Sequence, residues 1–259
     1  MQALVYRIFF ILFLLLPCFA WAETFTVSST VDEKEVSASF EMIKIPGKKY
    51  FMGKTEVTCE LYEIVMGKNP SSFAEEQCPV NNVSWYDCLV FCNRLSLMLG
   101  KKPVYSVNFS VNPDDWDYSP HGGSSIQGKI LQNPKADGFR LSTEEEWEFA
   151  AKGGQTYKYP GGDNLDEFAW FKENSDFKLH KVAEKSPNAF GLYDMSGNVW
   201  EWCWNLFIED SECYRIHKGG SCASGKELCE IKFTGRHYAS RSQPCYSYCT
   251  FGLRIARNL

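Results

Sequence analysis

The sequence predicts a single loop-rich domain of the α+β class, with two main helices, many short strands and long loops. Two segments carry helix-capping residues followed by a helical pattern, and a third alternates tryptophans as a strand does. Nineteen glycines and eleven prolines indicate many turns. Forty-four per cent of the 259 residues are hydrophobic and 15% are aromatic, which is enough to fill a sizeable core.

The first main helix is predicted from Ser84 to about Leu99. Asp87 lies in its first turn, where the helix dipole favours an anion, and Gly100 stops it. Apolar residues recur at intervals of three and four, so that one face belongs to the core: Trp85, Leu89, Cys92, Leu95 and Leu99.

The second main helix is predicted to start near Ser142. Ser142 and Glu145 have the Ser-x-x-Glu spacing of a capping box, and further acidic residues stand in the first turn. The helix should run through Trp147 and end at Gly153.

Short strands are predicted at 40–46 and 50–58 around a turn at Gly47, and a short helix at 60–66. Residues 101–138 are polar and rich in turn residues, which indicates a long loop or a small hairpin insertion.

Tryptophans alternate in residues 198–205. Because side chains alternate along a strand, Trp200, Trp202 and Trp204 should share one face, and Glu201 and Cys203 the other.

Residues 1–22 have the pattern of a secretory signal peptide. Arg7 is the only charge, an apolar run of nine residues follows, and Ala20-Trp21-Ala22 has the small-x-small form of a cleavage site. The apolar run is too short to span a bilayer. A lipoprotein modified at Cys18 is the alternative, although a proline directly before the cysteine fits it poorly. We therefore expect an exported protein that is periplasmic, on the cell surface or secreted, and that does not span the membrane.

The rest of the chain is divided by composition. Residues 23–39 are polar and β-branched and are predicted to be a leader segment, and residues 40–259 to be the domain. The formal charge of −5 leaves no basic excess for phosphates, which argues against nucleic acid as a partner. Ten cysteines remain after residue 22. With no CxxC or HxxxH pattern, disulfides or buried thiols are favoured over zinc.

Several short motifs follow one another between about residues 40 and 257. They are F-M-G at 51–53 with E-V-T at 56–58, N-P-S at 69–71, P-V-N-N-V-S-W at 79–85, G-F-R-L-S-T-E-E-E-W-E at 138–148, G-L-Y-D-M-S-G-N-V-W-E-W at 191–202, G-G-S at 219–221 and G-L-R at 252–254. In order and spacing they resemble the formylglycine-generating enzyme family, also called the sulfatase-modifying-factor domain. The resemblance implies a loop-rich variant of the C-type-lectin fold with short antiparallel strands.

The resemblance also implies a structural calcium site. Asp194, Gly197, Val199 and Glu201 form the pattern D-x-x-G-x-V-x-E, in which two side-chain carboxylates and two backbone carbonyls would bind the ion. Hard oxygen donors suit Ca²⁺. The alternative is that the two carboxylates only accept hydrogen bonds from loop amides.

The catalytic pattern departs from the family. Active members are similar in using two cysteines, five positions apart and just after G-G-S, to hold copper(I) and to form a mixed disulfide with the substrate cysteine. This chain has Ser224 and Cys229 at those positions. The candidate catalytic residues are therefore Cys229 and Ser221 of the G-G-S motif, and Cys222 is the alternative second thiolate.

These observations favour an exported, catalytically degenerate family member that acts as a binding or ligand-display module. Its C-terminal segment, 222–250, offers Tyr, Ser, Arg, His and Gln side chains for adaptable contacts with a protein or glycan ligand. The alternative is an active copper-dependent oxidase that converts a sulfatase cysteine to formylglycine.

Overall fold

The computed structural model describes residues 22–31, 34–72, 75–240 and 251–259. The predicted signal peptide lies outside this part of the chain except for its last residue. The elements are β1 (Ala22–Val31), β2 (Lys34–Lys44), β3 (Tyr50–Gly53), α1 (Cys59–Met66), α2 (Trp85–Met98), β4 (Tyr105–Val107), β5 (Ile130–Gln132), β6 (Phe139–Leu141), α3 (Glu144–Lys152), β7 (Trp200–Glu209), β8 (Glu212–Lys218), β9 (Gly235–His237), β10 (Phe251–Gly252) and β11 (Ile255–Asn258). Among the described residues, no helix is both long enough and apolar enough to cross a bilayer.

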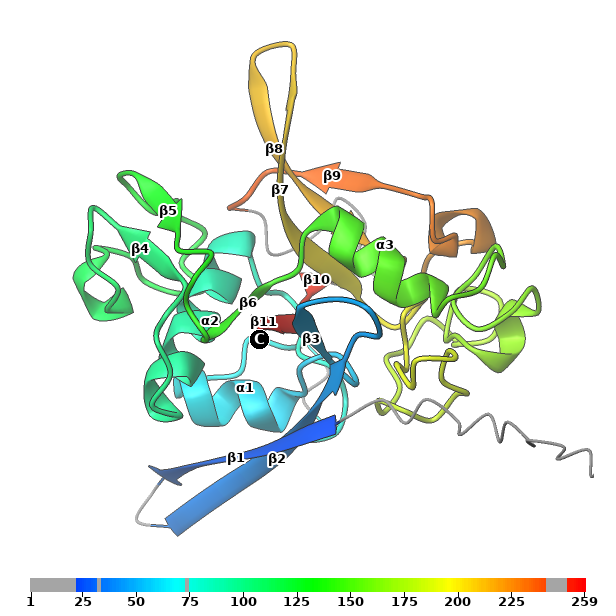
Figure 1. Cartoon of the computed structure of the whole chain (residues 1–259), viewed down its shortest axis with the longest axis horizontal. Helices are drawn as coiled ribbons and strands as arrows, with labels where there is room; N and C mark the ends of the chain where they lie inside the picture. Colours follow the sequence, from blue (N-terminus) through cyan, green and yellow to red (C-terminus); the bar gives the residue numbers. More distant parts are fainter. Residues whose placement is uncertain (1–21, 32–33, 73–74, 241–250) are drawn as a thin grey trace, which may run out of the picture.

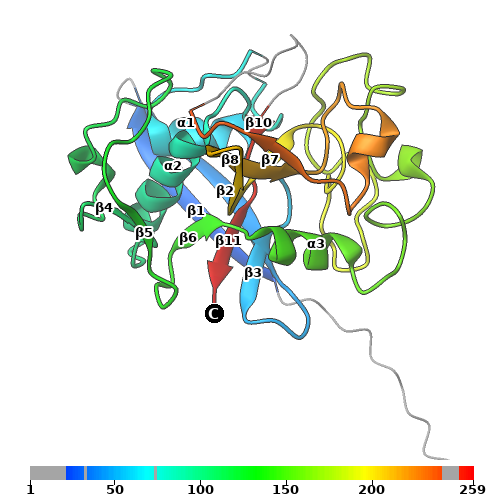
Figure 2. The same cartoon turned by 90° about the horizontal axis from the view of Figure 1, so that it is seen from above.

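The strands form three sheets (Figures 1 and 2). A five-stranded antiparallel sheet has the order β1-β2-β3-β11-β6, so that the last strand of the chain lies in its interior. A four-stranded sheet has the order β10-β7-β8-β9, and its β10–β7 pair is parallel over two residues. The insertion at 101–138 contains the small antiparallel pair β4-β5. The prediction of one α+β fold with short antiparallel strands is confirmed.

Two helices begin and end close to the predicted residues. Thr58 caps α1, and Gly67 ends it in the left-handed conformation. Ser84 caps α2 with the full capping box, because its side chain and that of Asp87 each accept a hydrogen bond from the other's backbone amide. Gly100, with φ of 65°, follows α2.

The cap of α3 lies one residue later than predicted. The side chain of Thr143, not that of Ser142, accepts a hydrogen bond from the backbone amide of Glu146. The Glu146 carboxylate in turn accepts a hydrogen bond from the backbone amide of Thr143. In the run Ser-Thr-Glu-Glu-Glu both registers satisfy the capping-box spacing. Tertiary contact decides between them, since Arg140 holds the Glu146 carboxylate in a bidentate pair.

Residues 23–31 and 34–39 do not form a leader: they belong to the paired strands β1 and β2 of the five-stranded sheet. The polar residues of these two strands lie mainly on the exposed face of the sheet. The other face is anchored by Val27, which is buried, and by Phe25, whose ring stacks on Phe40 and meets the edge of Phe139. The partner Phe139 is about a hundred positions away, so local composition gave no sign of this packing.

The alternating tryptophans of β7 share one face, as predicted, and β7 contributes to two hydrophobic clusters. Trp200 and Trp202 are buried in the larger cluster, with Trp204 packed against it, and Cys203 lies in the second cluster on the other face. The Trp202 indole donates to the carbonyl of Val83, which ties β7 to the start of α2.

Candidate functional site

The loop that follows β8 holds the candidate catalytic residues. Gly220 has φ of 82°, and a Cβ there would lie 2.7 Å from the Sγ atom of Cys229, so only glycine lets the loop pass this close to the sulfur. The Ser224 hydroxyl accepts from the backbone amide of Ser221 at 2.9 Å and lies 3.1 Å from the Ser221 hydroxyl. Both serines are buried and close the loop on itself.

Cys229 is fully buried, at the end of a short 3-10 helix (Lys226–Cys229). It packs in a small apolar cluster with Tyr159, Leu165, Ala169 and Phe171. Burial raises the pKa of the Cys229 thiol to about 12. At neutral pH this residue is therefore a thiol rather than the thiolate that binds metal or attacks a disulfide.

Cys222, the alternative second thiolate, lies in different surroundings from Cys229. It is buried with Leu179 and Val199, in a cluster separate from that of Cys229. The loop thus places a pair of mutually bonded serines next to one protonated thiol. At position 224 the loop therefore offers copper(I) a hydroxyl rather than a soft ligand.

The second candidate site is a buried ion pair between Glu201 on β7 and Arg254. Both side chains are 1% exposed. The Glu201 Oε1 atom accepts from Arg254 Nη2 at 2.7 Å and from Nε at 2.9 Å, and Oε2 accepts from the indole of Trp147 at 2.6 Å. Both oxygens of this carboxylate are therefore fully used.

Arg254 also bonds to backbone carbonyls from two other segments. It donates to Gly53 at the end of β3, at 3.0 Å, and to Tyr193 and Asp194 at 2.8 and 3.2 Å. One guanidinium thus connects both large sheets with the 193–194 loop.

Two further carboxylates surround this pair. Asp194 accepts from the amide of Ala183 at 2.7 Å through Oδ2, while its buried Oδ1 atom has no partner. Glu56 accepts from Val199 and from the side chain of Asn198. The sequence places Glu56 in the E-V-T motif, but its bonds to Asn198 and Val199 could not be predicted, because these partners are about 140 positions away.

Burial is the main cause of the raised pKa values of the two outer carboxylates, Glu56 and Asp194. Burial, and then the charges of Asp194 and Glu201, raise the pKa of Glu56 well above its usual range. Burial raises the pKa of Asp194 to about 6, against the lowering effects of the Ala183 amide and Arg254. The cluster therefore takes up protons in the folded state.

The two carboxylates of the predicted calcium site differ in the oxygens that they have left. Asp194 keeps an uncommitted oxygen, but both oxygens of Glu201 accept hydrogen bonds from Arg254 and Trp147, and calcium at this site stays a prediction. No group of three or more His, Cys, Asp or Glu side chains in the described ranges is arranged to hold a metal ion. Here Arg254 supplies the positive charge.

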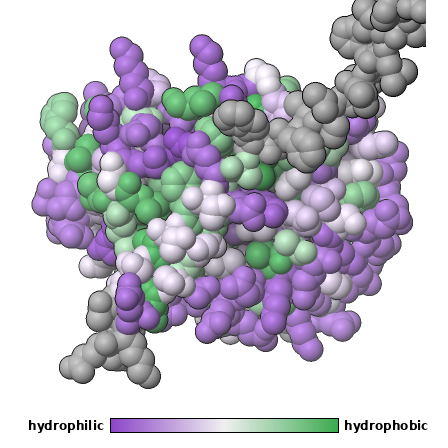
Figure 3. All heavy atoms as spheres, turned by 60° about the horizontal axis from the view of Figure 1, so that its bottom comes forward, coloured by the Kyte–Doolittle hydropathy of each residue, from purple (hydrophilic) through white to green (hydrophobic). Residues whose placement is uncertain are grey.

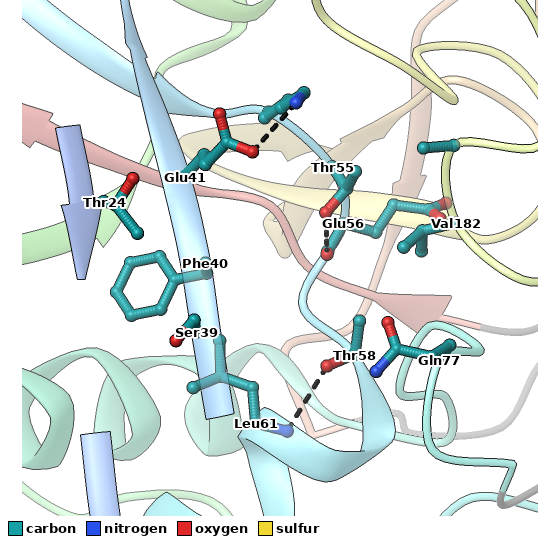
Figure 4. A pocket seen from close by; sticks show the side chains of 12 residues that line it. Thr24, Ser39, Phe40, Glu41, Thr55, Glu56, Thr58, Leu61, Gln77 and Val182 are labelled. Atoms are coloured by element: carbon teal, nitrogen blue, oxygen red, sulfur yellow. Dashed lines mark hydrogen bonds and ion pairs between the residues drawn. The ribbon is translucent and has the colours of Figure 1, made fainter. Parts of the chain in front are cut away.

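A hollow of about 330 Å³ opens beside Glu56, between the β1–β2 hairpin and the loop after β3 (Figure 4). Its polar groups are largely satisfied by one another: Lys54 pairs with Glu41 at 2.9 Å, and Thr55 donates to the backbone carbonyl of Glu56. We assign no ligand to it.

The described part of the predicted C-terminal face lies beside the β7–β8 hairpin, which projects from the body of the molecule (Figure 1). Residues 241–250 lie outside the described ranges. Leu206 and Ile208 are 50% and 62% exposed, and Tyr238 is 43% exposed. A hollow of about 170 Å³ here is lined by Tyr86, Ser125, Leu206, Cys213, Arg215, Tyr238, Ala239 and Ser240.

Arg215 gives this face a positive charge. Its guanidinium stacks over the Trp85 ring at 3.7 Å. Burial lowers its pKa to about 10, so it remains a cation at neutral pH.

Comparison with known proteins agrees with the motifs. The model of the sulfatase-modifying factor enzyme 1-like domain matches residues 23–259. The chain belongs to this formylglycine-generating enzyme family. The match begins inside β1, as expected if the hairpin is part of the domain.

Relatives of this family member have diverse descriptions. The chaperone protein LppX of Paenibacillus barcinonensis is 33% identical over 256 residues, covering 90% of this chain and 85% of the relative. The Bos taurus inactive Cα-formylglycine-generating enzyme 2 is 37% identical over 97 residues, and the match spans about a third of each chain, 32%. The solved structure of Treponema denticola variable protein 1 has a TM-score of 0.74 and 32% identity, covering 90% of this chain and 99% of that one.

We predict that Arg254→Met lowers the free energy of unfolding by about 3–5 kcal/mol, because it leaves Glu201 buried without its cation. Urea unfolding measures this change. Lys54→Met is the control. It breaks a half-exposed pair with Glu41 and should cost less than about 1 kcal/mol. Equal losses in the two variants would contradict the role of Arg254.

The raised pKa of Asp194 predicts a pH-dependent stability. A carboxyl that holds its proton more tightly when folded stabilises the protein below its unfolded pKa of 3.8, and this stability is lost as pH rises through about 6. The loss is roughly 3 kcal/mol at 1.36 kcal/mol per pKa unit. Glu56 acts in the same direction.

Asp194→Asn isolates this contribution, since an amide cannot titrate. The free energy of unfolding, measured by urea titration from pH 4 to 7, should fall more steeply in the wild type than in the variant. Parallel curves would show that Asp194 titrates normally.

Chelation tests the calcium assignment. Because Arg254 already neutralises Glu201, EDTA should leave the melting temperature of the wild type unchanged. A bound ion would instead stabilise the fold by about 2.7 kcal/mol at a hundredfold excess over Kd. A drop in melting temperature with EDTA that disappears in Glu201→Gln would restore calcium to this site.

Proposed function

We propose that this protein is a catalytically degenerate member of the family that acts as a binding module, presenting its C-terminal face to a protein or glycan ligand. The proposal depends first on the cysteine loop. Position 224 carries a hydroxyl, and the thiol of Cys229 is fully buried with a raised pKa. A hydroxyl is a harder ligand than a thiolate and far less acidic than a thiol, so neither group suits copper(I) at neutral pH.

The second support is the surface beside β9. Exposed Leu206 and Tyr238 line a hollow that is also lined by the cation of Arg215, and exposed Ile208 stands on the same hairpin as Leu206. Aromatic and apolar side chains with an arginine among them are the groups that dominate protein interfaces. A ligand with both apolar and anionic groups suits this surface.

The relatives are compatible with such a role. One carries the word inactive in its description, and two that each cover 90% of this chain are described as a chaperone and as a variable protein. With the signal-peptide pattern of residues 1–22, we place the binding module outside the cytoplasm, in the periplasm, on the cell surface or secreted.

The test of degeneracy is to incubate the copper-loaded protein with a Cys-x-Pro-x-Arg peptide in air and to follow the peptide by mass spectrometry. We expect no conversion of its cysteine to formylglycine. Ser224→Cys should bind copper(I) more tightly than the wild type, because it restores a second soft ligand. Conversion by the wild type that is lost in Cys229→Ser would overturn the proposal and support the oxidase.

The binding face is tested in the same protein with glycan arrays and displayed peptide libraries. Ligands found with the wild type should be lost in Leu206→Ser and Tyr238→Ala. Thr55→Ala is the matched control, because Thr55 lines the separate hollow beside Glu56, and this variant should retain the ligands. Ligands that bind all variants equally would place the binding site elsewhere.

A further inference from the structure

The outer edge of the five-stranded sheet is formed by β1, and it lacks the usual protection of an edge strand. The opposite edge is β6, which has three residues. β1 has ten residues, pairs with β2 without a bulge, and contains no proline, glycine or lysine. Short strands, bulges, prolines and lysines are the devices that keep edges from pairing with other chains.

The register shows which backbone groups of β1 are available. Ile45 donates to Tyr50, and Lys54 donates to Glu41, so the odd-numbered residues of β2 bond towards β3. In an antiparallel ladder successive residues bond to opposite sides, so the even-numbered residues of β2 bond to β1. Their partners there are odd-numbered.

The even-numbered residues of β1 therefore direct their N–H and C=O groups to the open edge. They include Thr24, Thr26 and Ser28, whose side chains are exposed. In the part of the chain that the structure describes, no other segment bonds to the backbone of β1. These groups form a continuous template for one more strand.

The edge is complementary to a second copy of itself. If two β1 strands run antiparallel about Thr26, residue 24 faces residue 28 of the copy and Thr26 faces its own equivalent. Every open N–H then meets an open C=O, as the ladder requires. The same register places threonine and serine side chains opposite one another, a pairing that stabilises antiparallel strands.

Charge does not oppose this pairing. Glu23 is the only charged residue of β1, and in this register it faces Ser29 rather than another carboxylate. Glu23 is moreover held by Arg257 of its own chain. A self-complementary strand whose one charge is already paired within its own chain favours a second copy over a partner chosen by charge.

The position of the hairpin leaves room for a copy. β1 and β2 lie along one side of the molecule, away from the four-stranded sheet (Figure 1). Figure 3 turns this side forward, where pale surface of intermediate hydropathy lies between strongly hydrophilic regions. The proposed binding face is carried by β7, β8 and β9 in the other large sheet, so it stays accessible.

We propose that β1 is a homodimerisation edge: two copies pair β1 to β1 in antiparallel fashion about Thr26 and join two five-stranded sheets into one continuous sheet. The interface is isologous, with one patch used twice. Strand pairing alone buries little surface, so the dimer is a weak one of the size class below about 1,200 Å². It presents two binding faces at once, which raises avidity for a repeated ligand.

Sedimentation equilibrium of the purified protein over a concentration series tests the proposal. The wild type should show a monomer–dimer equilibrium. Thr26→Pro removes an N–H that points to the open edge and leaves the β1–β2 bonds intact, so it should fold normally. It removes two central bonds of the symmetric pair and should weaken dimerisation about tenfold or more. Thr26→Val keeps the N–H and is the matched control, which should still dimerise.

A second measurement is independent of affinity. In an antiparallel bonded pair the two Cα atoms lie about 5.5 Å apart, within the range of a disulfide. Thr26→Cys should therefore form, under mild oxidation by a small disulfide, a covalent dimer whose link peptide mapping places at the two introduced thiols. Val27→Cys, on the buried face, should not.

A wild type that stays monomeric at every concentration would overturn the proposal, as would a Thr26→Pro variant that dimerises as well as the wild type. Circular dichroism and the melting temperature of each variant verify that the hairpin is folded. Because the edge is distinct from the binding face, dimerisation and ligand binding can fail independently.

Discussion

The buried pair of Arg254 and Glu201 connects parts of the chain that would otherwise be separate layers. Arg254 stands just before β11 in the five-stranded sheet, and Glu201 lies on β7 in the four-stranded sheet. The remaining donors of the guanidinium bind carbonyls at the end of β3 and in the 193–194 loop. A buried charge must be paired and hydrogen-bonded, so the positions of all these segments depend on one another.

This constraint also explains the acid cluster around the pair. Glu56 and Asp194 lie against Glu201, and a single guanidinium does not neutralise three carboxylates. The fold accommodates the excess by holding protons on Glu56 and Asp194 more tightly than the unfolded chain does, since their pKa values are raised. Buried carboxylates are stabilised by a cation beside them, and in this cluster the cation is the side chain of Arg254.

The interactions that hold the two large sheets together are separate from those that position the cysteine loop after β8. The loop after β8 keeps the glycines that allow close approach to Cys229, yet it buries the thiol among aromatic and aliphatic side chains. The family's fold is formed with a serine at position 224, because the fold depends on the charge cluster and on the tryptophans of β7. Surfaces on the two large sheets are then available for binding and for association.

Local patterns in the sequence determined the helices, the alternating faces of β7 and the family motifs, since capping, periodicity and spacing depend on nearby residues. Tertiary structure decided the rest. Arg140 binds the Glu146 carboxylate and so favours Thr143 over Ser142 as the cap, and Phe139 packs against Phe25 and so helps to hold a polar segment in β1. The role of Glu201 follows from a cation 53 positions away, and the protonation of Cys229 from the side chains that bury it. Burial and long-range charge are properties of the folded chain, and no local window of the sequence contains them.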